Sequence, residues 1–125
     1  MNTKVLSNYG IEFRVVKKFG AKTWVGAFQQ EPSLVNFFIC AYLEEMAINI
    51  IRDDVLIQLS NALKRQSFDE DGGGFETFLL IGETLSTFSS TNSGAGTATI
   101  PTQDVNDIFE AWVEWIAINN LEKYL

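Results

Sequence analysis

The first third of the chain holds two short runs of strand-forming residues. Residues 11–16 and 23–28 are rich in Val, Ile, Phe and Trp, which pack well on a pleated surface. A polar stretch separates the two runs, and its Gly20 can adopt the positive φ angle of a turn. This pattern predicts an N-terminal β-hairpin.

An almost continuous apolar segment follows the predicted hairpin. Pro32 and Ser33 are typical of a helix start, and residues 34–51 are almost entirely apolar. The polar positions in this range are Asn36, Glu44, Glu45 and Asn49. Because a helix that is apolar on nearly all sides belongs inside a fold, we expect a central helix over residues 34–51.

A second helix is expected directly after this segment. The charged residues 52–54 interrupt the apolar pattern, and either Asp53 or Asp54 can accept hydrogen bonds from the free N–H groups of a new helix. Leucines at positions 56, 59 and 63 then form one apolar stripe. The pattern predicts a helix from about Asp54 to Gln66.

The middle of the chain is dominated by small residues. Three consecutive glycines predict a loop over residues 68–74, because glycine loses the most backbone entropy on folding. Residues 75–88 fit both a helix and a buried strand, and the run 77–81 favours a short strand near 75–82. Residues 86–100 are rich in Ser, Thr, Gly and Ala and predict a mobile surface loop.

The clearest helix begins after Pro101, where Thr102 or Asp104 can serve as its cap. Apolar residues then follow the spacing of one buried helix face: Val105, Ile108, Phe109, Trp112 and Ile116. On the other side, carboxylates occur at positions i, i+3 and i+7, next to Trp115: Asp107, Glu110 and Glu114. The spacing therefore predicts a ridge of carboxylates on the solvent side of this helix.

These elements predict a helix-rich α+β fold in which the hairpin packs on a bundle of three to four helices, with one short strand near 75–82. A chain of 125 residues is long enough for one domain with its own core, so we expect a single binding domain over residues 1–125. Its apolar runs are too short for a signal peptide or a membrane span. We therefore expect a cytoplasmic protein without a membrane partner.

Charge is distributed unevenly along the chain, whose net charge is -7. The first 22 residues carry five basic residues against one acidic residue, whereas residues 66–122 carry ten acidic residues and no Lys or Arg. Such acidity keeps many proteins soluble, but it also opposes direct nucleic-acid binding and favours a basic partner. The candidate contact residues are Asp69, Glu70, Asp71, Asp107, Glu110, Glu114 and Trp115.

The residue types needed for common catalytic sites are missing. The chain has no histidine and one cysteine, Cys40, which excludes Ser-His and Cys-His pairs and a thiolate zinc site. The apolar neighbours of Cys40 predict a small buried side chain. No Gly-Lys-Ser/Thr follows Gly72–Gly74, so this segment is not a phosphate loop, and Thr99 stands where a dinucleotide-binding fingerprint that starts at Gly94 needs its third glycine. Leu80 stands where an EF-hand that starts at Asp69 needs its glutamate. We expect no catalytic residue, cofactor or metal.

Three segments resemble the immunity proteins of bacterial contact-dependent growth inhibition and related polymorphic toxin systems. They are residues 23–28 leading into the helix after Pro32, the acidic turn 68–71, and the ending from Ile100 through Trp115. The resemblance implies a cytoplasmic antidote that binds the C-terminal toxin domain delivered by a neighbouring cell, often a nuclease, and covers its active site. It implies no catalytic residues. We expect a monomer that binds one basic toxin domain.

Other protein classes fit the same sequence features. A phage-encoded inhibitor that mimics nucleic acid would also be small and acidic. A small enzyme could use Glu44–Glu45 and Asp53–Asp54 to hold a divalent metal, since carboxylate oxygens are the ligands that magnesium prefers. An adaptor subunit of a larger assembly is a further alternative.

Overall fold

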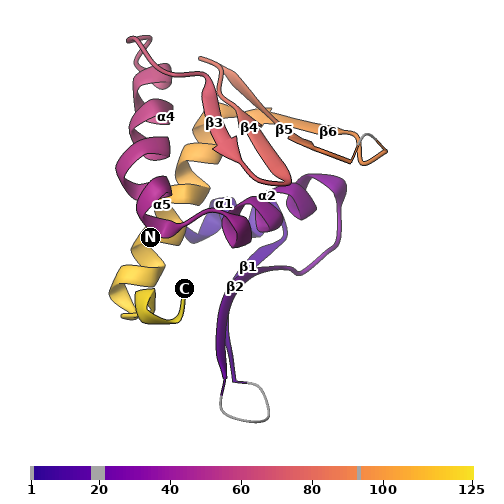
Figure 1. The fold of residues 1–125 in the computed structure, drawn as a ribbon, viewed down its shortest axis with the longest axis vertical. Helices are drawn as coiled ribbons and strands as arrows, with labels where there is room; N and C mark the ends of the chain where they lie inside the picture. Colours follow the sequence, from indigo (N-terminus) through magenta and orange to yellow (C-terminus); the bar gives the residue numbers. More distant parts are fainter. Residues whose placement is uncertain (1, 18–21, 93) are drawn as a thin grey trace.

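The structure, a computed structural model, describes residues 2–17, 22–92 and 94–125. It is an α+β fold in which helices pack on one face of a four-stranded antiparallel sheet, and a separate two-stranded hairpin extends from this body (Figure 1). The elements in chain order are α1 Thr3–Asn8, β1 Ile11–Lys17, β2 Thr23–Gln29, α2 Leu34–Glu45, α3 Ile48–Ile50, η1 Ile51–Val55, α4 Leu56–Leu63, β3 Asp71–Gly74, β4 Thr77–Leu80, β5 Leu85–Ser90, β6 Thr97–Pro101, α5 Thr102–Ile118 and η2 Glu122–Tyr124.

The N-terminal hairpin is confirmed. β1 and β2 pair antiparallel from Ile11 opposite Gln29 to Lys17 opposite Thr23, and the turn expected around Gly20 lies outside the described residues. The end of the hairpin attached to the body is well packed, because the ring of Phe13 lies 5.1 Å from that of Trp112. The distant end projects away from the helices (Figure 1).

Helix α2 begins as expected. The Ser33 hydroxyl accepts from the N–H of Asn36, and the Asn36 side chain accepts from the N–H of Ser33, which is a capping box. Its predicted end at residue 51 is wrong: Met46 is extended, and the next helical segment starts at Ile48, bent by 105° from α2. The bend lets both helices bury apolar side chains, and neither glycine nor proline marks it in the sequence.

The predicted start of the second helix at Asp54 is also wrong. Helical structure runs from α3 through the π-helical segment η1 into α4, so Asp53 and Asp54 lie inside it, exposed to solvent, and cap nothing. Of the helices within the described residues, none is by itself long and apolar enough to cross a membrane, and Leu34–Glu45 with Ile48–Leu63 passes that test only as a bent pair.

The loop predicted over residues 68–74 contains a strand. β3 pairs with β4 through an irregular register, and its glycines permit a close approach that larger residues would prevent. A Cβ atom at Gly72 would lie 2.9 Å from the Leu79 side chain, and one at Gly74, where φ is +145°, would collide with the carbonyl oxygen of Thr77. The close approach that glycine allows between β3 and β4 therefore outweighs the backbone entropy that glycine loses on folding. The strand expected near 75–82 is confirmed as β4.

The mobile loop predicted over residues 86–100 is wrong as well, since β5 and β6 occupy most of it. Phe88, Ala98 and Ile100 alternate with hydroxyl residues and point into the core, where they are buried. Two small polar side chains are satisfied internally: the Ser86 and Thr102 hydroxyls lie 2.8 Å apart. β-branched threonines favour strands, so the Ser/Thr content was compatible with a sheet.

Helix α5 buries the expected apolar face, including Trp112. Neither candidate cap residue accepts from the free N–H groups of the helix start. Thr102 instead donates its hydroxyl to the carbonyl of Gly82, at 2.6 Å, and Asp104 accepts from the Tyr9 hydroxyl. The short helix α1, capped by Asn2, was not expected. The expected helical bundle is therefore only partly matched, because α2 and α5 pack on the sheet while α4 packs on α5.

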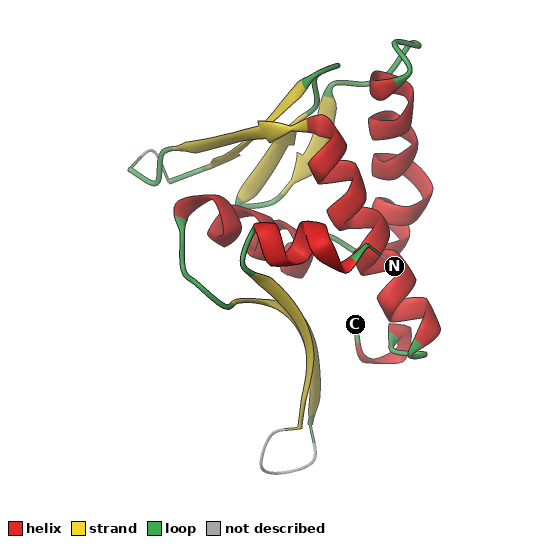
Figure 2. Ribbon diagram, turned by 180° about the vertical axis from the view of Figure 1, so that it is seen from behind, coloured by secondary structure: helices red, strands yellow, loops and turns green. Residues whose placement is uncertain are grey.

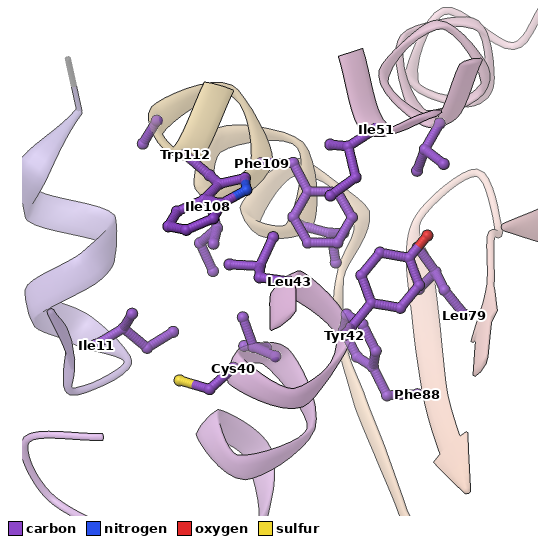
Figure 3. Close-up of a cluster of buried hydrophobic side chains, with 14 of the residues drawn as sticks. Ile11, Cys40, Tyr42, Leu43, Ile51, Leu79, Phe88, Ile108, Phe109 and Trp112 are labelled. Atoms are coloured by element: carbon purple, nitrogen blue, oxygen red, sulfur yellow. The ribbon is translucent and has the colours of Figure 1, made fainter. Parts of the chain in front are cut away.

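The core lies between α2, α5 and the inner face of the four-stranded sheet (Figure 3). The Tyr42 ring stacks on Phe109 at 5.2 Å and meets Phe88 edge-on, and its hydroxyl donates to the carbonyl of Gly72 at 2.6 Å. Cys40 leaves α2 on another side from Tyr42, toward the hairpin (Figure 3). Helix α2 therefore joins the sheet to the hairpin.

Candidate partner-binding surfaces

The carboxylate ridge expected on α5 lies at the surface. Glu110 and Glu114 are exposed and Asp107 is half-buried. Two of these carboxylates accept bonds from their own helix: Gln103 donates to Asp107 at 2.9 Å, and Asn106 donates to Glu110 at 3.1 Å. The side chains of Asp107 and Glu110 are therefore held in place by hydrogen bonds within the helix, while their carboxylates remain at the surface.

The acidic segment Asp69–Glu70–Asp71 serves the fold as well as the surface. The Asp69 carboxylate accepts from the N–H of Asp71 at 3.0 Å, and the Asp71 carboxylate accepts from the N–H of Gly73 at 2.8 Å. These bonds shape the entrance to β3. All three side chains are exposed, so Glu70 is the member whose charge can be changed with the smallest effect on the local backbone.

Trp115 makes its main contacts within the molecule. Its ring lies 5.9 Å from Trp112 and 5.5 Å from Phe13, and the side chain is half-buried. It therefore supports the attachment of the hairpin to α5, and a partner can reach only its remaining exposed part.

The structure does not bring the predicted contact residues together into one patch. The acidic segment follows α4 at the end of the body opposite to the projecting strands β1 and β2, whereas α5 runs from the sheet toward the C-terminal segment (Figures 1 and 2). Trp115 faces the attached end of the hairpin. A single partner would have to contact three different parts of the surface.

A groove that the sequence analysis missed lies between the hairpin, α2 and the C-terminal segment. It consists of two adjoining hollows of about 210 and 440 Å³, and Trp24 and Glu44 line both of them. We call this the β2–α2 groove. Its other lining residues include Phe28 and Ala27 from the hairpin, Phe37, Cys40 and Ala41 from α2, and Met46, Phe75, Tyr124 and Leu125.

Large apolar side chains are exposed along this groove. Phe37 is 51% exposed and Phe75 is 72% exposed, and Trp24, Tyr124 and Leu125 are exposed as well. Exposed apolar residues are ordinary when scattered, but a group of them around one concavity is typical of an interaction site. A signal in the sequence was available, because α2 has more apolar positions than one core face can bury.

The groove carries negative charge. Within the described part of the chain, its lining includes Glu44 and Glu45 and no Lys or Arg. Glu45 accepts from the N–H of Thr77 at 3.0 Å, whereas Glu44 is exposed and forms no ion pair with any described residue. Among the described residues, two cations outside the lining contact its aromatic rings: the Lys123 ammonium lies 5.3 Å from the Tyr124 ring centre, and the Arg14 guanidinium lies 4.1 Å from the Phe28 ring centre. Glu44 is therefore available to a cation from outside the molecule.

Cys40 lines the hollow beside β2 and is buried, as expected. Burial, and secondarily the charge of Glu44, raises the pKa of its thiol to about 11. The thiol therefore stays protonated near neutral pH and is a poor nucleophile.

The carboxylate pairs considered for metal binding do not converge. Asp53 is bound by Arg52 at 3.0 Å, which lowers the pKa of Asp53, and Glu45 is bound by the N–H of Thr77. Across the part of the chain that the structure describes, no group of three or more Cys, Asp or Glu side chains is arranged to hold a metal ion.

The groove has the chemistry of a binding site, with apolar surface around an exposed carboxylate. Comparison with protein-family models, with curated proteins and with solved structures finds no match for this chain.

Proposed function

We propose that this chain is an immunity-type binding protein that neutralises a basic toxin domain, most simply a nuclease, by covering its active site. The observation that carries the proposal is the β2–α2 groove, in which exposed aromatic side chains surround Glu44 and none of the described lining residues is Lys or Arg. The resemblance noted in the sequence supports the same function.

The groove has the features of an interface centre. Most binding energy in protein complexes comes from a few residues, often aromatic, that fill well-packed pockets from which water is excluded. Phe37 and Trp24 offer such surfaces, and Glu44 can pair with a Lys or Arg of the partner. The partner segment that fits has a bulky apolar side chain next to a basic one.

The more distant carboxylates contribute in another way. The α5 ridge and Glu70 lie outside the groove, so their charges attract a basic partner at long range without filling a pocket. Charges of this kind change the association rate and its salt dependence, whereas central contacts change the dissociation rate. The two surfaces therefore have separable kinetic signatures.

The test uses a basic toxin domain encoded next to this chain's gene. Its association and dissociation rates are measured at about 50 and about 300 mM salt, together with its enzymatic activity at increasing concentrations of the chain. Glu44→Lys and Phe37→Ala should each speed dissociation at least about tenfold and weaken protection. Reversing Asp107, Glu110 and Glu114 to lysine should slow association and leave dissociation nearly unchanged.

Two controls separate the groove from general acidity. Glu83→Lys reverses an exposed carboxylate outside the groove, whose solvent-exposed ion pair with Arg65 stabilises little, so binding should be unchanged. Glu70→Lys should reduce only the association rate. If Glu44→Lys and Glu83→Lys have equal effects, the groove is not the contact. If no basic partner binds at either salt concentration, the proposal fails, and thermal stabilisation by a divalent metal would favour the enzyme alternative.

A further inference from the structure

The two edges of the four-stranded sheet differ in how well they are protected. In the order β3-β4-β5-β6, the edge strands are β3 and β6. β3 is short, has an irregular register and carries the charged residue Asp71. Each of these features hinders pairing with the edge of another sheet. β6 has no charged residue, and each residue from Thr97 to Pro101 has a regular partner in β5; its protective device is Pro101, at its C-terminal end. The free edge of β6 is thus suited to pair with another strand.

The hydrogen-bond pattern shows which groups of β6 point away from β5. The N–H of Thr102 donates to the carbonyl of Thr84 at 2.9 Å. Since hydrogen-bonded and non-hydrogen-bonded pairs alternate in an antiparallel ladder, Ala98 and Ile100 direct their main-chain groups to β5. Thr97 and Thr99 direct theirs outward, and Pro101 offers only a carbonyl there.

The local charge identifies the occupant. Residues 85–103, which contain β5 and β6, have no ionisable side chain in a chain of net charge -7. A second copy can therefore approach this edge without bringing carboxylates of its own against the strand. Antiparallel pairing of the same strand is also self-complementary, as a two-fold interface requires.

We infer that β6 pairs with β6 of a second copy and joins the two four-stranded sheets into one. The register that uses both outward N–H groups places Thr97 of each copy opposite Thr99 of the other, so that each of these N–H groups donates to a carbonyl of the other copy. Pro101 lies beyond these pairs and ends the ladder. The β2–α2 groove is lined by residues outside β5 and β6, so each copy keeps its own groove. The inference does not depend on the proposed function, and it replaces the expected monomer with a dimer.

The mass of the purified chain in solution tests this inference, measured by light scattering and sedimentation from about 1 to about 200 µM. The expected species at high concentration has twice the chain mass of 14.0 kDa. Higher salt should not weaken it, because the paired edge is uncharged, whereas binding of a basic partner should weaken. A monomer over the whole range overturns the inference.

Matched variants locate the interface. Thr99→Pro removes an outward N–H, and Thr99→Lys adds a charge at the edge; each should weaken association at least about tenfold. Thr87→Lys is the control, because it adds the same charge one strand further in and breaks the same hydroxyl contact, between Thr87 and Thr99 at 2.9 Å. Circular dichroism checks that each variant is folded. If Thr99→Pro does not fold, Thr99→Lys provides the test of the interface. A dimer that survives Thr99→Lys, or dissociates equally with Thr87→Lys, overturns the assignment to β6.

Discussion

The two antiparallel sheets of this protein are stabilised in different ways. The four-stranded sheet forms one layer of the core, with Phe88 completely buried against Tyr42 and Phe109. The hairpin is packed only where it joins the body, and further out Val15 is 43% exposed. A hairpin by itself is marginally stable in water, so the hairpin depends on its attached end whereas the sheet depends on a whole face. The same type of pairing thus yields a scaffold in one region and a projecting arm in the other.

This difference matters for the β2–α2 groove, because one of its walls belongs to the packed core and the other belongs to the hairpin. Helix α2 is anchored in the core through Tyr42 and supplies Phe37 and Glu44, whereas β2 supplies Trp24 from the less supported hairpin. A wall of low local stability can adjust to a partner at small energetic cost.

The largest expected effect is in the core of the sheet. Phe88→Ala should lower the free energy of unfolding by about 3–5 kcal/mol, because it removes a completely buried ring and leaves a cavity. Val15→Ala in the hairpin should change it by less than about 0.5 kcal/mol. Urea denaturation of both variants measures the contrast. Equal losses would mean that the hairpin is part of the same packed core.

Two glycines provide a backbone version of the same comparison. Gly74→Ala should destabilise the protein by at least about 2 kcal/mol, because the new Cβ meets the Thr77 carbonyl at a φ of +145°. Gly26→Ala in the hairpin places its Cβ at an ordinary 3.5 Å from the Phe28 ring and should change stability by less than about 1 kcal/mol. Thermal unfolding compares the two variants. A tolerated Gly74→Ala would contradict the observed irregular β3–β4 pairing.

Loosening the attached end of the hairpin should separate the two regions. Phe13→Ala removes the ring that packs on Trp112 and Trp115, and a loss of about 2 kcal/mol is expected for a half-buried aromatic residue. Amide hydrogen exchange should then quicken in β1 and β2 well before it does in β4 and β5. Uniformly faster exchange in both sheets would show that they unfold together.

The smallest effect concerns Tyr42, which links α2 to β3. Burial, with smaller contributions from the charges of Asp54 and Asp71, raises the pKa of Tyr42 far above its usual value. The unfolded chain therefore releases this proton near pH 10 while the folded chain keeps it. The contribution of Tyr42 to the free energy of unfolding is thus fully present below pH about 10 and is lost progressively above it.

Tyr42→Phe tests this linkage. At neutral pH it should cost about 1 kcal/mol, because the carbonyl of Gly72 loses its donor. Above pH about 10, the free energy of unfolding of Tyr42→Phe should fall less steeply with pH than that of the wild type. The two slopes should differ by up to about 1.4 kcal/mol per pH unit. Urea denaturation at several alkaline pH values measures both slopes. Parallel slopes would mean that Tyr42 also ionises in the folded state.

Some of this structure was accessible from local patterns. The hairpin, the capping box at the start of α2 and the buried face of α5 all depend on residues close in sequence, whose periodicity and caps act locally. The carboxylate ridge followed from the same helical spacing. The partner expected for it stays a prediction.

The errors arose where distant contacts decide the structure. Glycine and Ser/Thr composition predicted loops over 68–74 and 86–100, yet pairing among β3, β4, β5 and β6 makes these segments strands. The bend between α2 and α3 likewise carries no local signal and depends on what each helix buries.

The sequence by itself determined the apolar faces, the helix start at Ser33 and the uneven charge, because these depend on neighbouring residues alone. Only the tertiary structure decided where the surplus apolar residues of α2 lie. It placed them beside Trp24, Phe75 and Tyr124, which come from three distant segments. It also left the β6 edge free, since strand order is set by long-range pairing that local propensity does not encode.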